Sequence, residues 1–453
     1  MPADEPIVAL ASAPGRGAVG VIRLSGPDLS AVLSHMFERP LRARHAHFGP
    51  LRDADGQVLD HGIAIHFPAP HSYTGEEVLE LQAHGGPVVM QLLLQAMLEI
   101  GRPIGLRLAR AGEFTERAFL NGKLDLAQAE AVADLIDAGS AQAARLAARS
   151  LAGDFSIEVN AIARAMLEAR MFVEACLDFP EEEIDFLADG EILRRVAGIA
   201  NDLTRLQTQA HQGALLREGM IVVIAGEPNV GKSSLLNALA RAEVAIVTDL
   251  PGTTRDRLSQ TVLIEGIPVE IIDTAGLRAT DDPIERIGIE RTRDGIARAD
   301  VVMWLADARE PHRDLAEDIA SDAIAAARAA GAAELRVLNK IDLSGGDAGE
   351  DARGRLLISA RTGAGLDVLR ARLLALAGWQ GAGEARFIAR ERHLQALAEA
   401  AGHLSRVPEA AVAGAELMAE ELRLAHRALG RITGEVSADD LLGEIFGRFC
   451  IGK

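Results

Sequence analysis

Residues 215–239 read LLREGMIVVIAGEPNVGKSSLLNAL, and this stretch decides the fold of the middle of the chain. An apolar run leads into a glycine-containing turn and then into a helical pattern, which is the strand, loop and helix order of a P-loop. Residues 226–233, GEPNVGKS, match G-x-x-x-x-G-K-[ST], in which backbone N–H groups and the lysine cradle phosphates and the last hydroxyl ligates magnesium. A glycine-rich turn without a ligand is the alternative, and the strand and helix around the motif disfavour it. The predicted phosphate-binding residues are Asn229, Val230, Gly231, Lys232, Ser233 and Ser234.

Further strand patterns follow at VEIIDTAG, DVVMWLAD and LRVLNKID, with helical stretches between them. This alternation is typical of a parallel α/β sheet. The pattern ends near residue 378, so we predict a P-loop domain over residues 217–378.

The segment NKID, Asn339 to Asp342, indicates which nucleotide binds. The carboxylate of Asp342 can accept hydrogen bonds from the N1–H and the 2-amino group of guanine, an arrangement that adenine does not offer. Asn339 and Lys340 belong to the same predicted site, and Ser359 and Ala360 in ISA bring a backbone donor for guanine O6. GTP is therefore the predicted ligand.

The turn from Asp273 to Gly276 is the Asp-Thr-Ala-Gly with which small GTPases hold magnesium-bound water beside the γ-phosphate. Upstream, TDLPGTTRD runs from Thr248 and contains Thr254, the predicted switch threonine that completes the magnesium shell. Ras-like GTPases follow the turn with a glutamine that orients the attacking water, whereas this chain has Leu277, whose side chain forms no hydrogen bonds. Either the protein does not hydrolyse GTP, or another group replaces the glutamine.

The composition is that of an ordinary globular protein, with 453 residues and 49% hydrophobic residues, enough for two to four domains. The net charge of −19 repels phosphate backbones, so any RNA contact must be local or come through a partner. An acidic N-terminal sequence and the lack of an apolar run of 18 residues predict a cytoplasmic protein without a membrane span. The two cysteines, Cys176 and Cys450, do not form a metal-binding pattern.

The segments on either side of the P-loop domain differ from it in residue composition and in the spacing of apolar residues. Residues 1–119 mix short β-branched runs with glycine and proline turns and one helical stretch, which predicts a small α+β domain. Residues 120–216 and 379–453 carry Ala, Leu and Glu at helical spacing. The economical interpretation is a multidomain α/β protein in which the P-loop domain is inserted into one discontinuous helical domain.

Several motifs in these flanking segments are more specific. They are APGRGAVGVIRLSG, SYTGEEVLELQAHGGPV, RAGEFTERAFLNGKLDLAQAEAVADLI, LDFPEEEIDF and the terminal DDLLGEIFGRFCIGK. Together with the nucleotide motifs, they make the whole chain resemble the tRNA modification GTPase family MnmE, also called TrmE. The resemblance implies an N-terminal folate-binding and dimerising domain, a discontinuous helical domain and an inserted Ras-like G domain.

The resemblance also implies an activity. Such a protein is a homodimeric, potassium-activated GTPase that works with an FAD- and NADH-dependent flavoprotein, MnmG or GidA, on C5 of the wobble uridine of tRNAs. The pair installs a (carboxymethyl)aminomethyl group, with a formyl or methylene tetrahydrofolate as the one-carbon donor. Contact with tRNA is expected mainly through the complex with the flavoprotein.

The same resemblance assigns ligands, with potassium in the position that an arginine finger occupies elsewhere. The implied ligands are, for potassium, Asn229, Thr248, Leu250 and Thr253; for magnesium, Ser233 and Thr254; and for folate, Arg23, Glu80, Lys123 and Lys453.

Two implied catalytic residues have structural alternatives. The resemblance makes Glu285 the residue that orients water in place of the missing glutamine, yet Asp282, Pro283 and Glu285 also fit a helix N-terminus closed by a capping box. From the residues alone the cap is favoured, and the resemblance reverses that preference. Cys450 lies in the terminal motif, where the family keeps a cysteine, but a lone cysteine is more often a small buried hydrophobe.

Other patterns and functions are disfavoured. Gly15, Gly17 and Gly20 match a dinucleotide fingerprint, but a strand pattern follows where that fingerprint requires a helix. A GTP-dependent RNA-binding assembly factor would carry a basic RNA-binding module, and none is visible in the sequence. A scaffold that uses nucleotide only structurally would not need Asn229 or the Asp-Thr-Ala-Gly turn.

Overall fold

A computed structural model describes residues 5–178, 190–242, 259–273, 295–310, 321–381, 385–435, 439–447, 449–450 and 452. The chain packs into two compact units, residues 1–133 with 427–453 and residues 134–426. Within the described ranges, no helix is long and apolar enough to cross a membrane.

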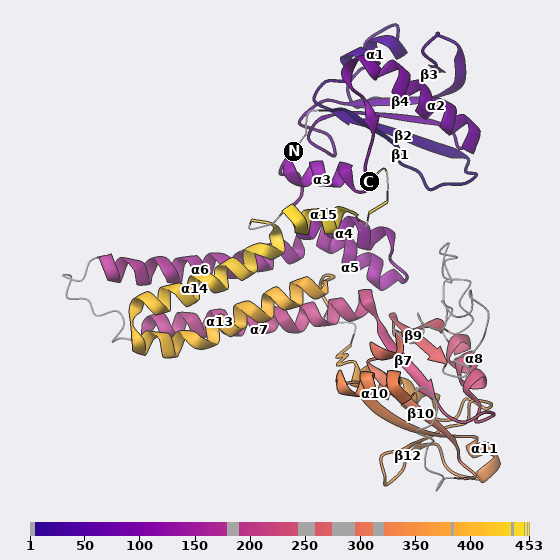
Figure 1. Cartoon of the computed structure of the whole chain (residues 1–453), viewed down its shortest axis with the longest axis vertical. Coiled ribbons are helices and arrows are strands. Elements are labelled where there is room, and N and C mark those ends of the chain that lie inside the picture. The colour runs from indigo at the N-terminus through magenta and orange to yellow at the C-terminus, as the bar shows by residue number, and fades with distance from the viewer. Residues whose placement is uncertain are drawn as a thin grey trace. The chain divides into compact units, whose positions relative to one another are not determined.

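The first unit is built on a six-stranded sheet (Figure 1). Its strands are β1 (Ile7–Leu10), β2 (Val19–Gly26), β3 (His47–Arg52), β4 (Val58–Phe67), β5 (Glu77–His84) and β6 (Arg107–Leu108). They lie in the order β3-β4-β5-β2-β1-β6, antiparallel throughout except for the parallel pair β1 and β6. Its helices are α1 (Ser30–Met36), α2 (Pro87–Ile100), the short 3₁₀ helix η1 (Arg102–Ile104) and α3 (Glu113–Leu120).

The two faces of this sheet have different chemistry because successive side chains of a strand point to opposite sides. On β2, Ile22 and Leu24 are fully buried in an apolar cluster with residues of α1 and α2. Arg23 and Ser25 alternate with them and therefore lie on the other face. Phe114 of α3 packs on that second face with Ile7 and Ala9 of β1. The polar face thus lies beside α3.

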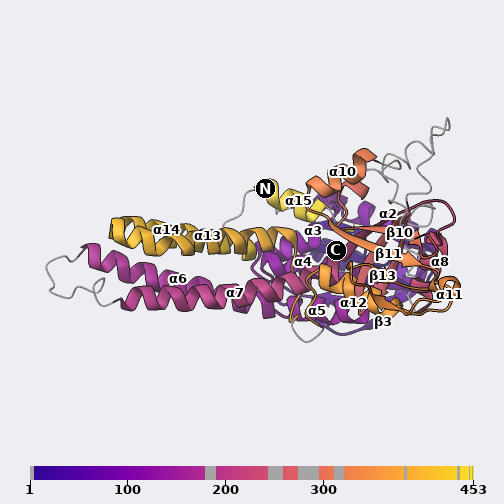
Figure 2. The same cartoon turned by 90° about the horizontal axis from the view of Figure 1, so that it is seen from below.

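Long helices dominate the flanking segments. They are α4 (Leu126–Ile136), α5 (Ala141–Leu151), α6 (Asp154–Asp178), α7 (Glu191–Glu218), α13 (Glu391–Ala413), α14 (Ala415–Thr433) and α15 (Asp439–Gly447). Figures 1 and 2 both show α6, α7, α13 and α14 running side by side. The hydroxyl of Ser140 caps α5 by accepting a hydrogen bond from the Ala143 N–H at 3.1 Å.

The second sheet has seven strands in the order β12-β13-β11-β10-β7-β9-β8. The strands are β7 (Met220–Ala225), β8 (Ser259–Ile264), β9 (Ile267–Asp273), β10 (Val301–Asp307), β11 (Ala333–Asn339), β12 (Gly349–Glu350) and β13 (Leu356–Leu357). The five inner strands β13, β11, β10, β7 and β9 are parallel, and β8 and β12 are antiparallel edges. Its helices are α8 (Lys232–Ala242), α10 (Ser321–Ala329), α11 (Ile341–Ser344) and α12 (Leu366–Leu376).

One hydrophobic cluster joins this sheet to the neighbouring helices. Ala143 and Leu146 of α5 and Leu216 of α7 are buried in the same cluster as residues of β7, β8 and β9. Between α7 and β7, Gly219 adopts φ +74°, and a Cβ there would lie 2.0 Å from the Pro268 carbonyl oxygen. Only glycine fits this turn, which passes the chain from helix to sheet.

Most of the elements predicted from the sequence are present. The β-branched runs GVIRLSG, HGIAIHF and EEVLELQAHGG form β2, β4 and β5, and the helical stretch VVMQLLLQAMLEI forms most of α2. The strands predicted in the P-loop domain are confirmed as β7, β9, β10 and β11. The strand at β2 also confirms that the glycine pattern before it does not open a helix. The helical segment predicted over residues 120–216 ends with α7 at Glu218. The predicted division at residues 119, 216 and 378 stays a prediction.

Candidate functional site

Four parallel strands bring their polar ends to one edge of the seven-stranded sheet. The P-loop follows β7, and Asp273, Asp307 and Asn339 end β9, β10 and β11. Ligands of open α/β sheets bind outside the carboxyl ends of the strands. This edge is therefore the candidate nucleotide site.

The P-loop is held in a compact turn around its lysine. Lys232 is 8% exposed, and its Nζ donates to the carbonyl oxygens of Gly226 at 2.6 Å and Glu227 at 3.1 Å. A Cβ on Gly226 would lie 2.3 Å from the Leu305 carbonyl oxygen, so only glycine allows the loop to lie against β10. Asn229 is left-handed at φ 65°, which turns the loop toward α8. Ser233 and Ser234 are exposed at the start of that helix.

Asn339 connects three loops of the site. Its side chain is 2% exposed, and Nδ2 donates to the Val230 carbonyl oxygen at 2.9 Å. Its Oδ1 accepts a hydrogen bond from the Ala360 N–H, also at 2.9 Å. The P-loop, the NKID segment and the ISA segment are thus joined through one buried amide.

A buried serine orients the carboxylate of Asp342, which is predicted to recognise guanine. Asp342 is exposed, and its Oδ1 accepts a 2.6 Å hydrogen bond from the hydroxyl of Ser359, which is fully buried. The same hydroxyl accepts a hydrogen bond from the Thr362 N–H at 3.2 Å. Ser359 therefore fixes the direction of the Asp342 carboxylate, a contact that the sequence did not reveal.

Lys340 is tethered by a residue that the sequence analysis missed. Its Nζ donates to the Asn229 carbonyl oxygen at 2.6 Å and to Asp307 Oδ2 at 2.9 Å, and its backbone is left-handed at φ 72°. Arg309 donates from Nε to Oδ1 of the same carboxylate at 3.0 Å and from Nη2 to Oδ2 at 2.7 Å. The hydrogen bonds from Arg309, which have the largest effect, and from Lys340 hold the pKa of Asp307 well below its usual range. Asp307 thus fixes both Lys340 and the P-loop turn.

Other predicted site residues lie outside the described residues. They are Thr248, Leu250, Thr253, Thr254, Gly276, Glu285 and Lys453, and Leu277 lies there too. Whether Glu285 caps a helix or reaches the nucleotide stays a prediction.

A second group of polar residues lies on the polar face of the six-stranded sheet, the face on which α3 packs. Arg23 and Glu80 are paired across β2 and β5, with Nε and Nη2 of Arg23 each 2.8 Å from Glu80 Oε1. The guanidinium lies 5.5 Å from the ring centre of Tyr73 and 5.8 Å from that of Phe114. Tyr73 is anchored in turn by a 2.9 Å hydrogen bond between its hydroxyl and that of Thr115. The two rings restrict the arginine and so orient the pair.

Lys123 reaches the same loop as Tyr73. Its Nζ donates to the Pro70 carbonyl oxygen at 3.0 Å, and its side chain is otherwise exposed. The neighbouring Asn121 donates from Nδ2 to the Thr74 carbonyl oxygen at 2.8 Å. Of the residues predicted for folate that the structure describes, Arg23 contacts Tyr73 and Lys123 contacts Pro70, while Glu80 is linked to this segment through its pair with Arg23.

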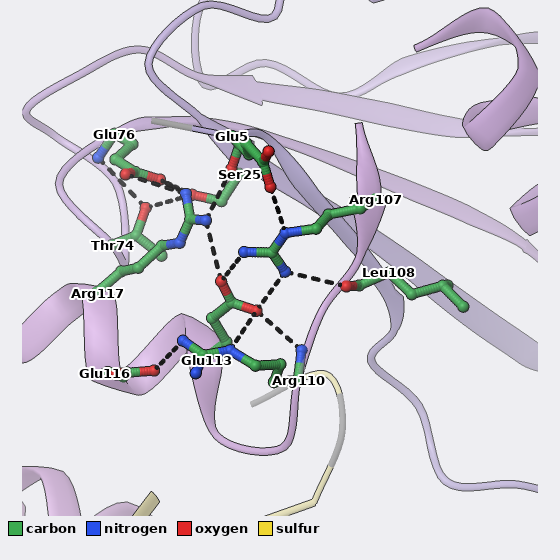
Figure 3. A network of polar contacts seen from close by, with 10 residues as sticks. All are labelled: Glu5, Ser25, Thr74, Glu76, Arg107, Leu108, Arg110, Glu113, Glu116 and Arg117. Atoms are coloured by element: carbon green, nitrogen blue, oxygen red, sulfur yellow. Dashed lines mark hydrogen bonds and ion pairs between the residues drawn. The ribbon is translucent and has the colours of Figure 1, made fainter. Parts of the chain in front are cut away.

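An ionic network joins α3 to β2 and β6 (Figure 3). Glu113 of α3 is 2% exposed and accepts hydrogen bonds from the guanidinium of Arg107 at 2.7 and 2.9 Å and from Nη2 of Arg117 at 3.1 Å. Arg117 also pairs with Glu76 at 3.0 Å, and Glu76 accepts from the Ser25 hydroxyl at 2.8 Å. Burial alone would raise the pKa of Glu113, but these hydrogen bonds outweigh it and lower the pKa to about 2.

The C-terminal tail belongs to the same unit. The Gly112 N–H lies 3.5 Å from the Cys450 carbonyl oxygen, and a Cβ on Gly452 would lie 2.4 Å from the Leu10 carbonyl oxygen. The thiol of Cys450 is free and the residue is exposed, in contrast to the buried alternative considered from the sequence. The tail therefore lies close against β1 and the start of α3.

A phosphate loop, a guanine-recognition segment and a central parallel sheet together define a P-loop GTPase. Two family models match the chain: "GTP-binding protein TrmE N-terminus" over residues 6–123 and "MnmE helical domain" over residues 126–450. The tRNA modification GTPase MnmE of Ralstonia nicotianae is 59% identical over 99% of this chain and 96% of its own length. That of Methylibium petroleiphilum is 57% identical over 99% of this chain and 98% of its own. The chain belongs to the MnmE family of tRNA modification GTPases.

Among solved structures, the G domain of the T. maritima FeoB iron transporter is similar at 23% identity. It covers 35% of this chain and 98% of its own, with a TM-score of 0.24, which is too low to add to the argument. Family membership confirms the predicted architecture of N-terminal α+β domain, helical domain and inserted G domain.

Proposed function

We propose that this GTPase is activated by potassium and modifies C5 of the wobble uridine of tRNAs together with an FAD-dependent MnmG partner. A (carboxymethyl)aminomethyl group is installed, with its one-carbon unit taken from a tetrahydrofolate. The protein acts as a cytoplasmic homodimer, in the four-part domain division predicted from the sequence. The observation that carries the nucleotide part of this proposal is the junction at Asn339, which joins the P-loop to both guanine-recognition segments.

GTP hydrolysis in this site rests on positioning and charge, with no covalent intermediate. The backbone N–H groups of the P-loop and the ammonium of Lys232 hold the β and γ phosphates. Asp342 selects guanine, and Lys340, fixed by Asp307, lies beside the base. Glu285 orients the attacking water, because Leu277 stands at the position where Ras-like GTPases have the glutamine.

The described residues fit both metal ions. Magnesium prefers oxygen ligands, and the exposed hydroxyl of Ser233 and the carboxylate of Asp273 lie at the same sheet edge. The exposed Asn229, held in its left-handed turn by Lys340, offers an amide oxygen for potassium. When bound, magnesium neutralises phosphate charge, and potassium supplies the charge that an arginine finger supplies elsewhere.

The polar face of the six-stranded sheet suits a folate. Glu80, paired with Arg23, can accept from the amino and ring N–H groups of a pterin, and Lys123 can meet a glutamate-tail carboxylate. Lys453, which lies outside the described residues, is proposed for the same tail. The rings of Tyr73 and Phe114 hold the guanidinium of Arg23, and Arg23 in turn holds the Glu80 carboxylate in one orientation. This supports the assignment. When bound, the folate supplies the one-carbon unit.

Steady-state GTP hydrolysis in potassium and in sodium at matched ionic strength tests the proposal. Turnover should be faster in potassium and should rise with protein concentration, because pairing of G domains orders the potassium loop. Asn229→Ala should lose the potassium effect, while Asn237→Ala, an exposed asparagine on α8, should keep it. Binding of a fluorescent GDP with aluminium fluoride gives a second readout and should require potassium. Equal, slow rates in both salts would refute the proposed activation.

A further inference from the structure

The loop before β3 carries an unusual concentration of positive charge. Residues 39–48 read RPLRARHAHF and contain three arginines and two histidines without a carboxylate, in a chain of net charge −19. Arg39, Arg42, Arg44 and His45 are all exposed. A local patch of this kind is the way in which an acidic protein can contact a polyanion.

Within the described residues these three arginines have no carboxylate partner, as some other exposed arginines do not, but here the three lie within six positions of one another. Within the described residues, none of the three forms an ion pair with Asp or Glu, and the Nη2 of Arg44 donates only to the His71 carbonyl oxygen at 2.7 Å. By contrast, Arg195 is 2.6 Å from Glu191 and Arg423 is 2.7 Å from Glu420. Guanidinium groups without an internal anion are available for an external one.

An aromatic pair lies next to the arginines. Phe48 is 76% exposed, and its ring centre is 6.4 Å from that of His61, with 33° between the ring planes. Phe48 lies on β3, the outermost strand of the six-stranded sheet. An exposed ring beside basic groups is the arrangement on which single-stranded nucleic acids stack their bases.

This edge lies on the same sheet face as the Arg23–Glu80 pair. Leu51 and Ala64 point into the apolar cluster under α1 and α2, so Phe48 and His61 point to the opposite side, as Glu80 does. Phe48 is opposite Ile63, whose partner Gln82 is two residues from Glu80 on β5. With strands about 4.8 Å apart and about 3.4 Å per residue, Phe48 and Glu80 are about 12 Å from one another.

We propose that residues 39–48 and His61, the basic edge, bind a single-stranded loop of RNA. The three arginines contact phosphates, and one base stacks on Phe48 and His61, on the same sheet face that is proposed for the one-carbon donor. The inference rests on the proposed function for the identity of the RNA, a tRNA loop that carries the wobble uridine. It adds a direct contact between this chain and tRNA, whereas the proposed function expects contact with tRNA mainly through the flavoprotein.

Fluorescence anisotropy of a labelled anticodon stem-loop, titrated with the full-length protein between about 50 and 200 mM salt, tests the basic edge. The variant R39Q/R42Q removes two positive charges from it, and R195Q/R423Q removes two from paired arginines as a matched control. Loss of two phosphate contacts should reduce the slope of log affinity against log salt by about 1.4 for a single strand. Phe48→Ser should weaken binding by about 5- to 100-fold.

Each result supports or overturns the inference. Reduced slopes in R39Q/R42Q but not in R195Q/R423Q support it. Equal slopes in both double variants, or no binding of the stem-loop by the wild-type chain, overturn it. A change in sedimentation of the edge variants with unchanged RNA binding would make the edge a self-interface instead. GTP hydrolysis in potassium and sodium on the same samples separates this outcome from failure of the proposed function, since the edge variants should hydrolyse GTP as the wild type does.

Discussion

Replacing Asn339 by alanine tests whether one buried amide holds the nucleotide site together. The change removes the donor to the Val230 carbonyl and the acceptor of the Ala360 N–H, both at 2.9 Å. Each buried group left without a partner costs about 1–3 kcal/mol, so the free energy of unfolding should fall by about 2–6 kcal/mol. Because the P-loop and the guanine segments are then no longer joined, GDP affinity should fall by roughly 10- to 100-fold.

Urea unfolding followed by tryptophan fluorescence measures the first effect. Trp304 lies in β10 and is 6% exposed, and the second tryptophan, Trp379, belongs to the same unit. Asn237→Ala, at an exposed position of α8, is the matched control and should leave stability within about 0.5 kcal/mol of the wild type. Titration with fluorescent GDP measures the second effect.

The outcome that would refute this reasoning is specific. If Asn339→Ala unfolds at the urea midpoint of the wild type and binds GDP as tightly, the amide does not connect the loops in solution. If stability falls but GDP affinity does not, the junction is structural only and does not organise the nucleotide site.

Three further predictions concern other parts of the molecule. Asp307→Asn should release Lys340 and Arg309, lower the urea midpoint and speed GDP dissociation by about 5- to 50-fold, measured by stopped flow; a lower midpoint with unchanged dissociation would remove the positioning role of Asp307. Glu113 has its pKa lowered to about 2 from 4.5, so it stabilises the fold above pH 4.5 and loses that contribution as the pH falls toward 2. Calorimetry should therefore show Glu113→Gln less stable than wild type by up to about 3 kcal/mol at pH 6 and nearly equal to it near pH 2, and an equal deficit at both pH values would contradict this. Glu285→Ala should slow GTP turnover about 10²- to 10³-fold and leave GTP affinity unchanged, whereas a fall in stability without loss of turnover would assign it to the helix cap.

The sequence predicts the longer inner strands, among them β2, β7 and β10, because their buried faces give strong apolar patterns, whereas the inner strand β1, with four residues, was missed. Ile221 to Ala225 and Val301 to Leu305 are unbroken apolar runs, as strands covered on both sides require. The short strands β6, β12 and β13 have two residues each and leave no pattern to detect. The edge strand β8 begins with Ser259 and Gln260, whose polarity hides it.

The motif residues of the nucleotide site were predictable because each motif combines residue types that phosphate or guanine chemistry demands. Their supporting residues were not, since the contacts form between distant segments. Asp307 meets Lys340 across 33 positions only because β10 and β11 are parallel neighbours that end at the same edge. The ring contacts of Tyr73 and Phe114 with Arg23 likewise depend on how α3 lies on the sheet.

Two basic side chains beside the P-loop, Lys340 and Arg309, are fixed by hydrogen bonds. This limits which groups can take over from the catalytic glutamine that Leu277 replaces. Lys340 is held by Asp307 and the Asn229 carbonyl, and Arg309 is held by Asp307. Neither can swing toward the γ-phosphate without breaking charge-assisted hydrogen bonds, each worth about 1.5–3 kcal/mol. Lys232 also bonds within the loop, to the carbonyl oxygens of Gly226 and Glu227, but among the described residues it has no carboxylate partner. The potassium proposed at Asn229 would add positive charge for the transition state, as an arginine finger does elsewhere.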